Sequence, residues 1–179
     1  TETEAKATQE NTTPSTPATA IERGNNIAFE AQGALLGQVS QALQQGGPTY
    51  AIGYCNVKAN PIIDSISNKE NVVIERLALR HRNANNYLKT ATDSAVYLSY
   101  NQAIAAGEMP SPRLENTAEG RYFYKPIVMG MEACLKCHGT PNKQVKENTL
   151  AAIAKTYPND NALNFALGDL RGIWKIKLD

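Results

Sequence analysis

The residues with the clearest chemistry are two cysteines and a histidine in the segment Cys134-Leu-Lys-Cys137-His138. C-x-x-C-H is the attachment signature of c-type haem. One compact turn brings two thiols to the vinyl groups on one edge of a porphyrin and sets the adjacent imidazole beneath the iron. The spacing therefore predicts a single covalent haem c, with thioether bonds to Cys134 and Cys137 and with His138 as the proximal iron ligand.

Three other chemistries of paired cysteines fit the chain less well. A structural zinc site needs four ligands, usually in two pairs, and the remaining soft or imidazole ligands, Cys55 and His81, are isolated in the sequence. A redox-active dithiol is typical of a parallel βαβ setting, which the pattern around Cys134 does not suggest. A plain disulfide between Cys134 and Cys137 is the third alternative. Haem attachment is favoured over all of them.

A second axial ligand would have to come from upstream of the motif, because the chain after His138 contains no Met, His or Cys. This argues against the common small cytochromes c, whose distal methionine follows the haem motif. Among the candidates, Cys55 is favoured because it lies on the apolar face of an expected helix. A lone thiol in an exported protein is also open to oxidation unless something protects it. The candidates are Cys55, His81, Met109, Met129 and Met131.

The surrounding pattern predicts a mixture of helices and strands. Apolar residues at helical spacing predict helices over residues 21–45, 49–59, 92–106 and 142–156. β-branched or alternating stretches predict strands at 71–79, 121–129 and 170–178. Gly46-Gly47-Pro48 is expected to end the first helix, and Pro61 is expected to stop or bend the second. Either Thr92 or Asp93 is expected to cap the third. The predicted class is α+β with an antiparallel sheet and flanking helices.

Composition limits the possible functions. With 179 residues, of which 42% are hydrophobic, the chain is long enough for one soluble domain with a real core. Eighteen basic residues against seventeen acidic ones argue against nucleic-acid binding as the main function. No apolar run approaches the roughly 18 residues of a membrane span.

The first twenty residues differ from the rest. Residues 1–20 contain seven threonines and no large aliphatic or aromatic residue, so they are expected to be a disordered linker before a domain at 21–179. Such a segment is typical of exported proteins held off a surface. Together with thioether haem, it predicts a periplasmic or otherwise extracytoplasmic protein that is tethered to a membrane through this segment.

Four stretches of the chain together resemble the PAS-like c-type haem domain family. This family occurs as stand-alone haem proteins in cyanobacteria and other bacteria and as the input domain of membrane sensors. The resemblance implies an antiparallel PAS-like sheet preceded by a long helix, and an iron with His138 as proximal and Cys55 as distal ligand. One departure is Ala84, where the family usually has proline. The matching stretches are Tyr50–Ala59, Leu79–Asn86, Tyr122–Gly139 and Leu167–Leu178.

Two functions follow as expectations. The first is a low-potential cytochrome that acts in extracytoplasmic electron transfer or as a redox-responsive subunit. Its partner would be a redox protein or a membrane complex. A low potential is expected because thiolate ligation favours ferric iron. The alternative is a redox or gas sensor in which Cys55 leaves the iron on reduction. An enzyme is less favoured, since no distal acid–base pair is evident. Arg121 and Tyr122 are expected to contact the haem propionates, with Arg80, Arg82 and Lys125 as further candidates.

Overall fold

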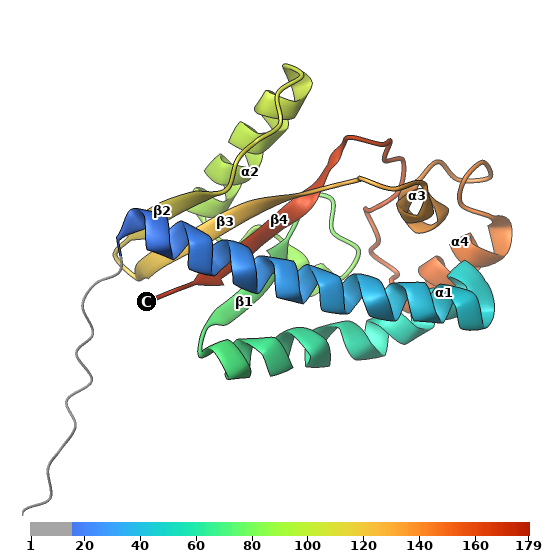
Figure 1. Cartoon of the computed structure of the whole chain (residues 1–179). Coiled ribbons are helices and arrows are strands. Elements are labelled where there is room, and N and C mark those ends of the chain that lie inside the picture. Colours follow the sequence, from blue (N-terminus) through green and yellow to red (C-terminus); the bar gives the residue numbers. More distant parts are fainter. Residues whose placement is uncertain (1–15) are drawn as a thin grey trace, which may run out of the picture.

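The computed structural model describes residues 16–179, which form a four-stranded antiparallel sheet flanked by helices (Figure 1). The order of strands in the sheet is β1-β4-β3-β2. The predicted α+β class, with a long N-terminal helix and an antiparallel sheet, is confirmed. The elements are α1 (Pro17–Glu70), β1 (Val73–Leu77), η1 (Ala84–Asn86), α2 (Ala91–Ala105), β2 (Arg113–Thr117), β3 (Gly120–Val128), α3 (Glu132–His138), α4 (Glu147–Thr156) and β4 (Leu170–Lys177).

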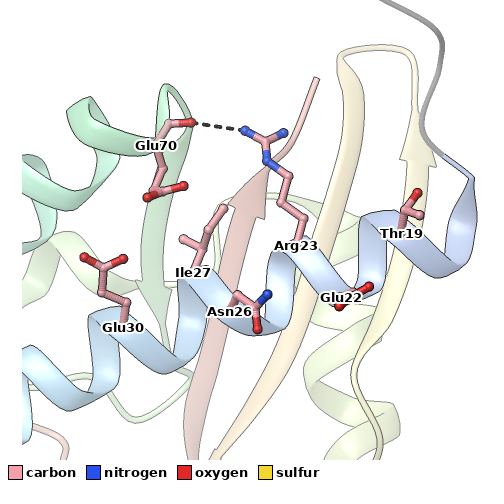
Figure 2. A pocket seen from close by; sticks show the side chains of 7 residues that line it. All are labelled: Thr19, Glu22, Arg23, Asn26, Ile27, Glu30 and Glu70. Atoms are coloured by element: carbon pink, nitrogen blue, oxygen red, sulfur yellow. Dashed lines mark hydrogen bonds between the residues drawn. The ribbon is translucent and has the colours of Figure 1, made fainter.

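Helix α1 is a hairpin of two helical arms (Figure 1). The backbone leaves helical geometry at Gly46 and at Gly47, where φ is 69°. A positive φ is a conformation that glycine adopts without steric cost, so the predicted break at this point is confirmed. Near the open end of the hairpin, the Arg23 guanidinium donates to the backbone carbonyl of Glu70 (Figure 2) and to that of Leu178.

The second arm is longer than predicted. It continues past Pro61 to Glu70 and ends where Asn71 adopts a left-handed conformation with φ 51°. Of the two alternatives expected at Pro61, a stop is therefore wrong, and the backbone keeps helical dihedral angles through this position. Proline removes one helical hydrogen bond, but Pro61 is exposed and the apolar face continues beyond it with the buried Ile63 and Ile66. Packing of that face outweighs the local cost of the proline.

The first arm begins earlier than predicted. Thr16 caps the helix by accepting a hydrogen bond from the Thr19 amide, and Pro17 occupies the first helical position, where its missing N–H costs nothing. Ala20 is fully buried. The last four residues of the expected linker therefore belong to α1. Residues 1–15 lie outside the described residues, and for them the linker stays a prediction.

The two faces of the sheet are covered by different helices. Trp174 and Ile176 of β4 pack in one core cluster with the α1 hairpin, while Ile173 packs in another with α2. In β3, Phe123 packs in the cluster with α1 and Tyr124 packs in the cluster with α2. Side chains alternate between the faces of a strand, so burial on both faces leaves most of β4 buried. Figure 1 shows α1 and α2 on opposite sides of the sheet.

Two further differences from the predicted elements arise from edge and cap geometry. β2 was not predicted, because its sequence RLENT lacks apolar alternation; it is an edge strand paired only with β3.

Helix α2 is capped by Thr90, and Asp93 completes the capping box from the third helical position. Asp93 is also fully buried and accepts from the Tyr124 hydroxyl at 2.7 Å and from Lys175 at 3.0 Å, which fastens α2 to the sheet.

The last predicted helix is shorter than expected. α4 begins at Glu147 rather than near residue 142. The chain turns first, because Asn142 has φ 60° and its amide donates to the Val145 carbonyl. Within residues 16–179, no helix is both long enough and apolar enough to cross a membrane.

Gly24 lets α1 approach the sheet closely. A Cβ atom at this position would lie 2.3 Å from Cγ of the buried Phe123, whereas a Cβ at Gly33 on the same arm would meet nothing within 4 Å. We expect Gly24→Ala to lower the free energy of unfolding by about 1–3 kcal/mol through overpacking. Gly33→Ala should instead raise it by up to about 1 kcal/mol through helix propensity. Urea denaturation measures both changes, and equal effects of the two substitutions would contradict the close contact.

Candidate functional site

The predicted ligands come together around one cavity. It has a volume of about 480 Å³ and lies among the α1 hairpin, one end of the sheet and the segment that contains α3. Cys55, Cys134, Cys137 and His138 all line it. A volume of this size lies within the range of sites for small molecules and cofactors, roughly 300–1,000 Å³. Most of its wall is apolar, with contributions from Leu35, Val39, Ile52, Ile62, Ile127 and Trp174.

Helix α3 contains the complete C-x-x-C-H segment. Its buried Leu135 packs with Met129, Ala162 and Phe165, which fixes the helix between the end of β3 and the loop before β4. Cys134 and Cys137 are free, half-buried thiols on its cavity side. The motif is therefore held rigidly, while both sulfur atoms remain available to an occupant of the cavity.

The His138 ring has a defined orientation. Its Nδ1 lies 2.8 Å from the carbonyl oxygen of Ala162. Because a carbonyl only accepts hydrogen bonds, Nδ1 carries the proton and the neutral ring keeps a free lone pair on Nε2. Desolvation lowers the pKa of His138 well below its ordinary value, and the positive charges of Arg171 and Arg82 add to the effect. A neutral imidazole with a free Nε2 is the form that binds a metal.

A strap formed by residues 157–169 supports the back of this histidine. The Phe165 amide donates to the His138 carbonyl at 2.9 Å, and the Asn164 amide donates to the Gly139 carbonyl at 3.0 Å. The Phe165 ring meets the His138 ring edge-on, with centroids 6.1 Å apart. Nothing in the local sequence indicated that this segment would pack behind the motif.

Cys55 approaches the cavity from the second arm of α1. The thiol is half-buried, and burial raises its pKa, while the guanidinium of Arg76 acts in the opposite direction. A negative charge on Cys55 would help to raise the pKa of Cys137 and of Tyr157, because the three side chains lie near one another. The cavity thus brings together residues that lie more than seventy positions apart in the chain.

Three of the other ligand candidates also line the cavity, namely His81, Met129 and Met131, whereas Met109 does not. Nδ1 of His81 is buried without a hydrogen-bond partner. The backbone carbonyl of His81 accepts from the Asn161 amide, so His81 is attached to the strap on the same side as His138. Met129 is already committed to the core cluster beneath α3. Cys55, by contrast, approaches on a separate helix.

The charged residues on the cavity wall are all basic. Lys58, Arg76, Arg82 and Arg171 line it, and its lining includes no aspartate or glutamate among the described residues. Burial, together with the charges of Arg82 and Arg76, lowers the pKa of Arg171 to about 10. Arg82 already has a counter-ion in Asp160 outside the lining. The positive charge that Arg76 and Arg171 add to the wall of an apolar cavity suits an occupant that bears negative charge.

The structure places Arg121 and Tyr122, the residues expected to contact the propionates, outside the lining of this cavity. They lie at the start of β3, whereas the cavity is lined by the other end of the strand at Ile127 and Val128. Five or six residues of strand separate the two positions by roughly 20 Å. Arg121 pairs through its backbone with the C-terminal residues, and Tyr122 lies beneath the Lys175 ammonium at 4.8 Å.

Two of the further candidates are also placed elsewhere. Lys125 and Arg80 are not part of the lining. Arg80 donates to the Leu163 carbonyl, and its guanidinium lies 4.0 Å from the centre of the Phe165 ring. Arg76 was overlooked as a cavity residue. A signal for it existed, since Glu75 and Arg76 interrupt the apolar stretch at residues 72–79 and neighbouring strand residues face opposite sides, so that one of the two charges faces the protein.

The architecture has a known counterpart. It matches the crystal structure of the cyanobacterial haem protein Tll0287 with a TM-score of 0.68 and 21% sequence identity, covering 91% of this chain and 96% of that one. No curated protein matches the sequence. The sequence model of the Tll0287-like protein family matches residues 3–178. The chain therefore belongs to the Tll0287-like family.

Proposed function

We propose that the protein is a mono-haem c-type cytochrome that transfers single electrons outside the cytoplasm, to or from a redox partner protein or a membrane complex. The observation that carries the proposal is the convergence of Cys134, Cys137, His138 and Cys55 on one cavity. Its support from known proteins is membership of the Tll0287-like family and a fold like that of a protein described as a haem protein.

The residues around the cavity fit a covalently attached haem. Cys134 and Cys137 would form the thioether bonds, and Nε2 of His138 would hold the iron from one side. Cys55 would hold it from the other side. Bound haem supplies an iron that takes up and releases one electron. A thiolate from Cys55 favours the ferric state, so the reduction potential is expected to be low compared with that of His/Met cytochromes.

Covalent attachment is tested by mass. In cells that mature c-type cytochromes, the wild-type protein should gain the mass of one haem and give a haem-stained band after denaturing electrophoresis. The periplasmic fraction should contain that band. Replacing both cysteines, in C134A/C137A, should abolish the band because no thioether can form. A wild-type protein that loses its haem on denaturation would contradict the proposal.

The distal ligand is tested in the ferric state. Cys55→Ala should shift the ferric Soret band, because a strong thiolate donor is lost. Ser67→Ala is a suitable control, since this residue lies on the same arm of α1 and does not line the cavity. Identical spectra of wild type and C55A would remove Cys55 from the iron.

A sensor is the second candidate, and the protonation of Cys55 favours it. Burial raises the pKa of this thiol, so its neutral form is favoured whenever the iron holds it weakly. In a sensor, Cys55 would take up a proton and leave the iron on reduction. The spectra of the same proteins after reduction separate the two functions. A carrier keeps its ligands and does not bind carbon monoxide, whereas a sensor loses Cys55 and binds it.

Arg76 and Arg171 of the cavity wall are proposed to hold the two propionates, because Arg121 and Tyr122 lie at the other end of β3. In the C134A/C137A background, Arg76→Met should weaken non-covalent haem binding about tenfold, as expected for a lost charged hydrogen bond. Binding of haem dimethyl ester, which has no carboxylates, should not change. Arg113→Met, on β2 outside the cavity, is the matched control. Equal weakening of both ligands by R76M would contradict a carboxylate contact.

A further inference from the structure

Arg82 lies on the His138 side of the cavity. It makes hydrogen bonds to two backbone carbonyls in addition to its ion pair with a carboxylate. It is 9% exposed. Its Nε and Nη2 donate to the Asp160 carboxylate at 3.0 and 3.3 Å. Nη2 also donates to the carbonyl of Cys137 at 2.7 Å and to that of Ala162 at 3.2 Å. Because Nη2 has two hydrogens for three acceptors, at least one of these hydrogen bonds is bifurcated. One guanidinium therefore joins the cysteine–histidine motif to the strap behind it.

Asp160 completes this arrangement. Its Oδ1 accepts from the Ala162 amide at 3.0 Å as well as from Arg82. The peptide groups of Ala162 are therefore held from both sides, by a carboxylate at the amide and by a guanidinium at the carbonyl. The buried charge of Arg82 is compensated, and the position of the Ala162 carbonyl oxygen is fixed.

The same carbonyl oxygen is the hydrogen-bond partner of His138. It accepts from His138 Nδ1 at 2.8 Å and from Arg82 Nη2 at 3.2 Å. A carbonyl has two lone pairs and can accept both bonds. A cationic donor draws electron density from the oxygen, which makes it a weaker acceptor for the second donor. The partner of the non-ligating nitrogen tunes the basicity of a metal-bound histidine.

We propose that Arg82 is a positioning residue that limits the donor strength of His138 toward the haem iron by sharing the Ala162 carbonyl. The inference rests on the proposed function and deepens it. With Arg82 in place, the Nδ1 proton stays closer to the ring, the imidazole donates less charge to the iron, and the ferrous state is stabilised. Arg82 thus opposes the effect of the Cys55 thiolate.

The test uses the haem-loaded protein and two neighbouring arginines. Arg82→Met should shift the ferric–ferrous equilibrium about tenfold toward the ferric form, within the range for outer-shell partners of a metal ligand. For one electron this is a midpoint potential lower by about 59 mV. Arg80→Met is the matched control, because Arg80 contacts the same strap through the Leu163 carbonyl. R80M should change the equilibrium by less than twofold.

A second variant covers the case in which R82M does not fold. Arg82→Lys keeps the charge beside Asp160, but its single nitrogen cannot reproduce the fork of a guanidinium. It should shift the potential in the same direction as R82M. The proton resonance of His138 Nδ1 should move downfield in R82M and R82K, because its acceptor becomes stronger, and stay in place in R80M. A purely structural role of Arg82 would instead loosen this hydrogen bond and move the resonance upfield.

The outcomes separate the two proposals. Covalent haem in all proteins, with the potential and the Nδ1 resonance of both Arg82 variants equal to wild type, overturns the role of Arg82 and leaves the proposed function standing. An equal shift in R82M and R80M also overturns it, because loss of a positive charge would then account for the change. A wild-type chain without haem overturns both proposals.

Discussion

The reversal of α1 at Gly46 and Gly47 determines how the cavity is built. Because the two arms lie antiparallel, the second arm returns along the sheet and carries Cys55 toward the segment that contains the cysteine–histidine motif. Ile52 on this arm packs with Val145 and Ile153, so α4 fixes the arm just beyond the turn. A straight helix of the same length would extend away from the sheet and leave the cavity without its second wall.

The two walls of the cavity differ in how they support the side chains proposed as iron ligands. His138 lies on a short helix with a buried anchor, a backbone acceptor for Nδ1 and an aromatic ring behind it. Cys55 lies on one arm of a long hairpin, and burial favours its neutral thiol. The contrast follows from the fold, since one proposed ligand is enclosed by a strap and the other lies on a helix face. The two proposed functions, carrier and sensor, differ in whether Cys55 stays bound to the iron.

Patterns of neighbouring residues predicted the motif and several of the secondary-structure elements. The CLKCH segment, the glycine break in α1, the strand containing Trp174 and the α+β class could be read from neighbouring residues. Contacts between distant segments could not. Arg82 and Asp160 are 78 positions apart, and no periodicity links them. The place of Arg121 on a predicted strand did not reveal which end of that strand lines a cavity. The helix continues past Pro61 because packing of the buried Ile63 and Ile66 outweighs the local cost of the proline.

The basic wall of the cavity has a consequence for how the chain matures. The positive charges of Arg82 and Arg76 help to lower the pKa of Arg171. Arg82 has a counter-ion in Asp160, so the guanidinium charges left for an anionic occupant to balance are those of Arg76 and Arg171. The carboxylates of the proposed haem would balance them, and its binding free energy would add to the stability of the folded domain. Loading of the proposed haem and stability of the domain would then be thermodynamically coupled.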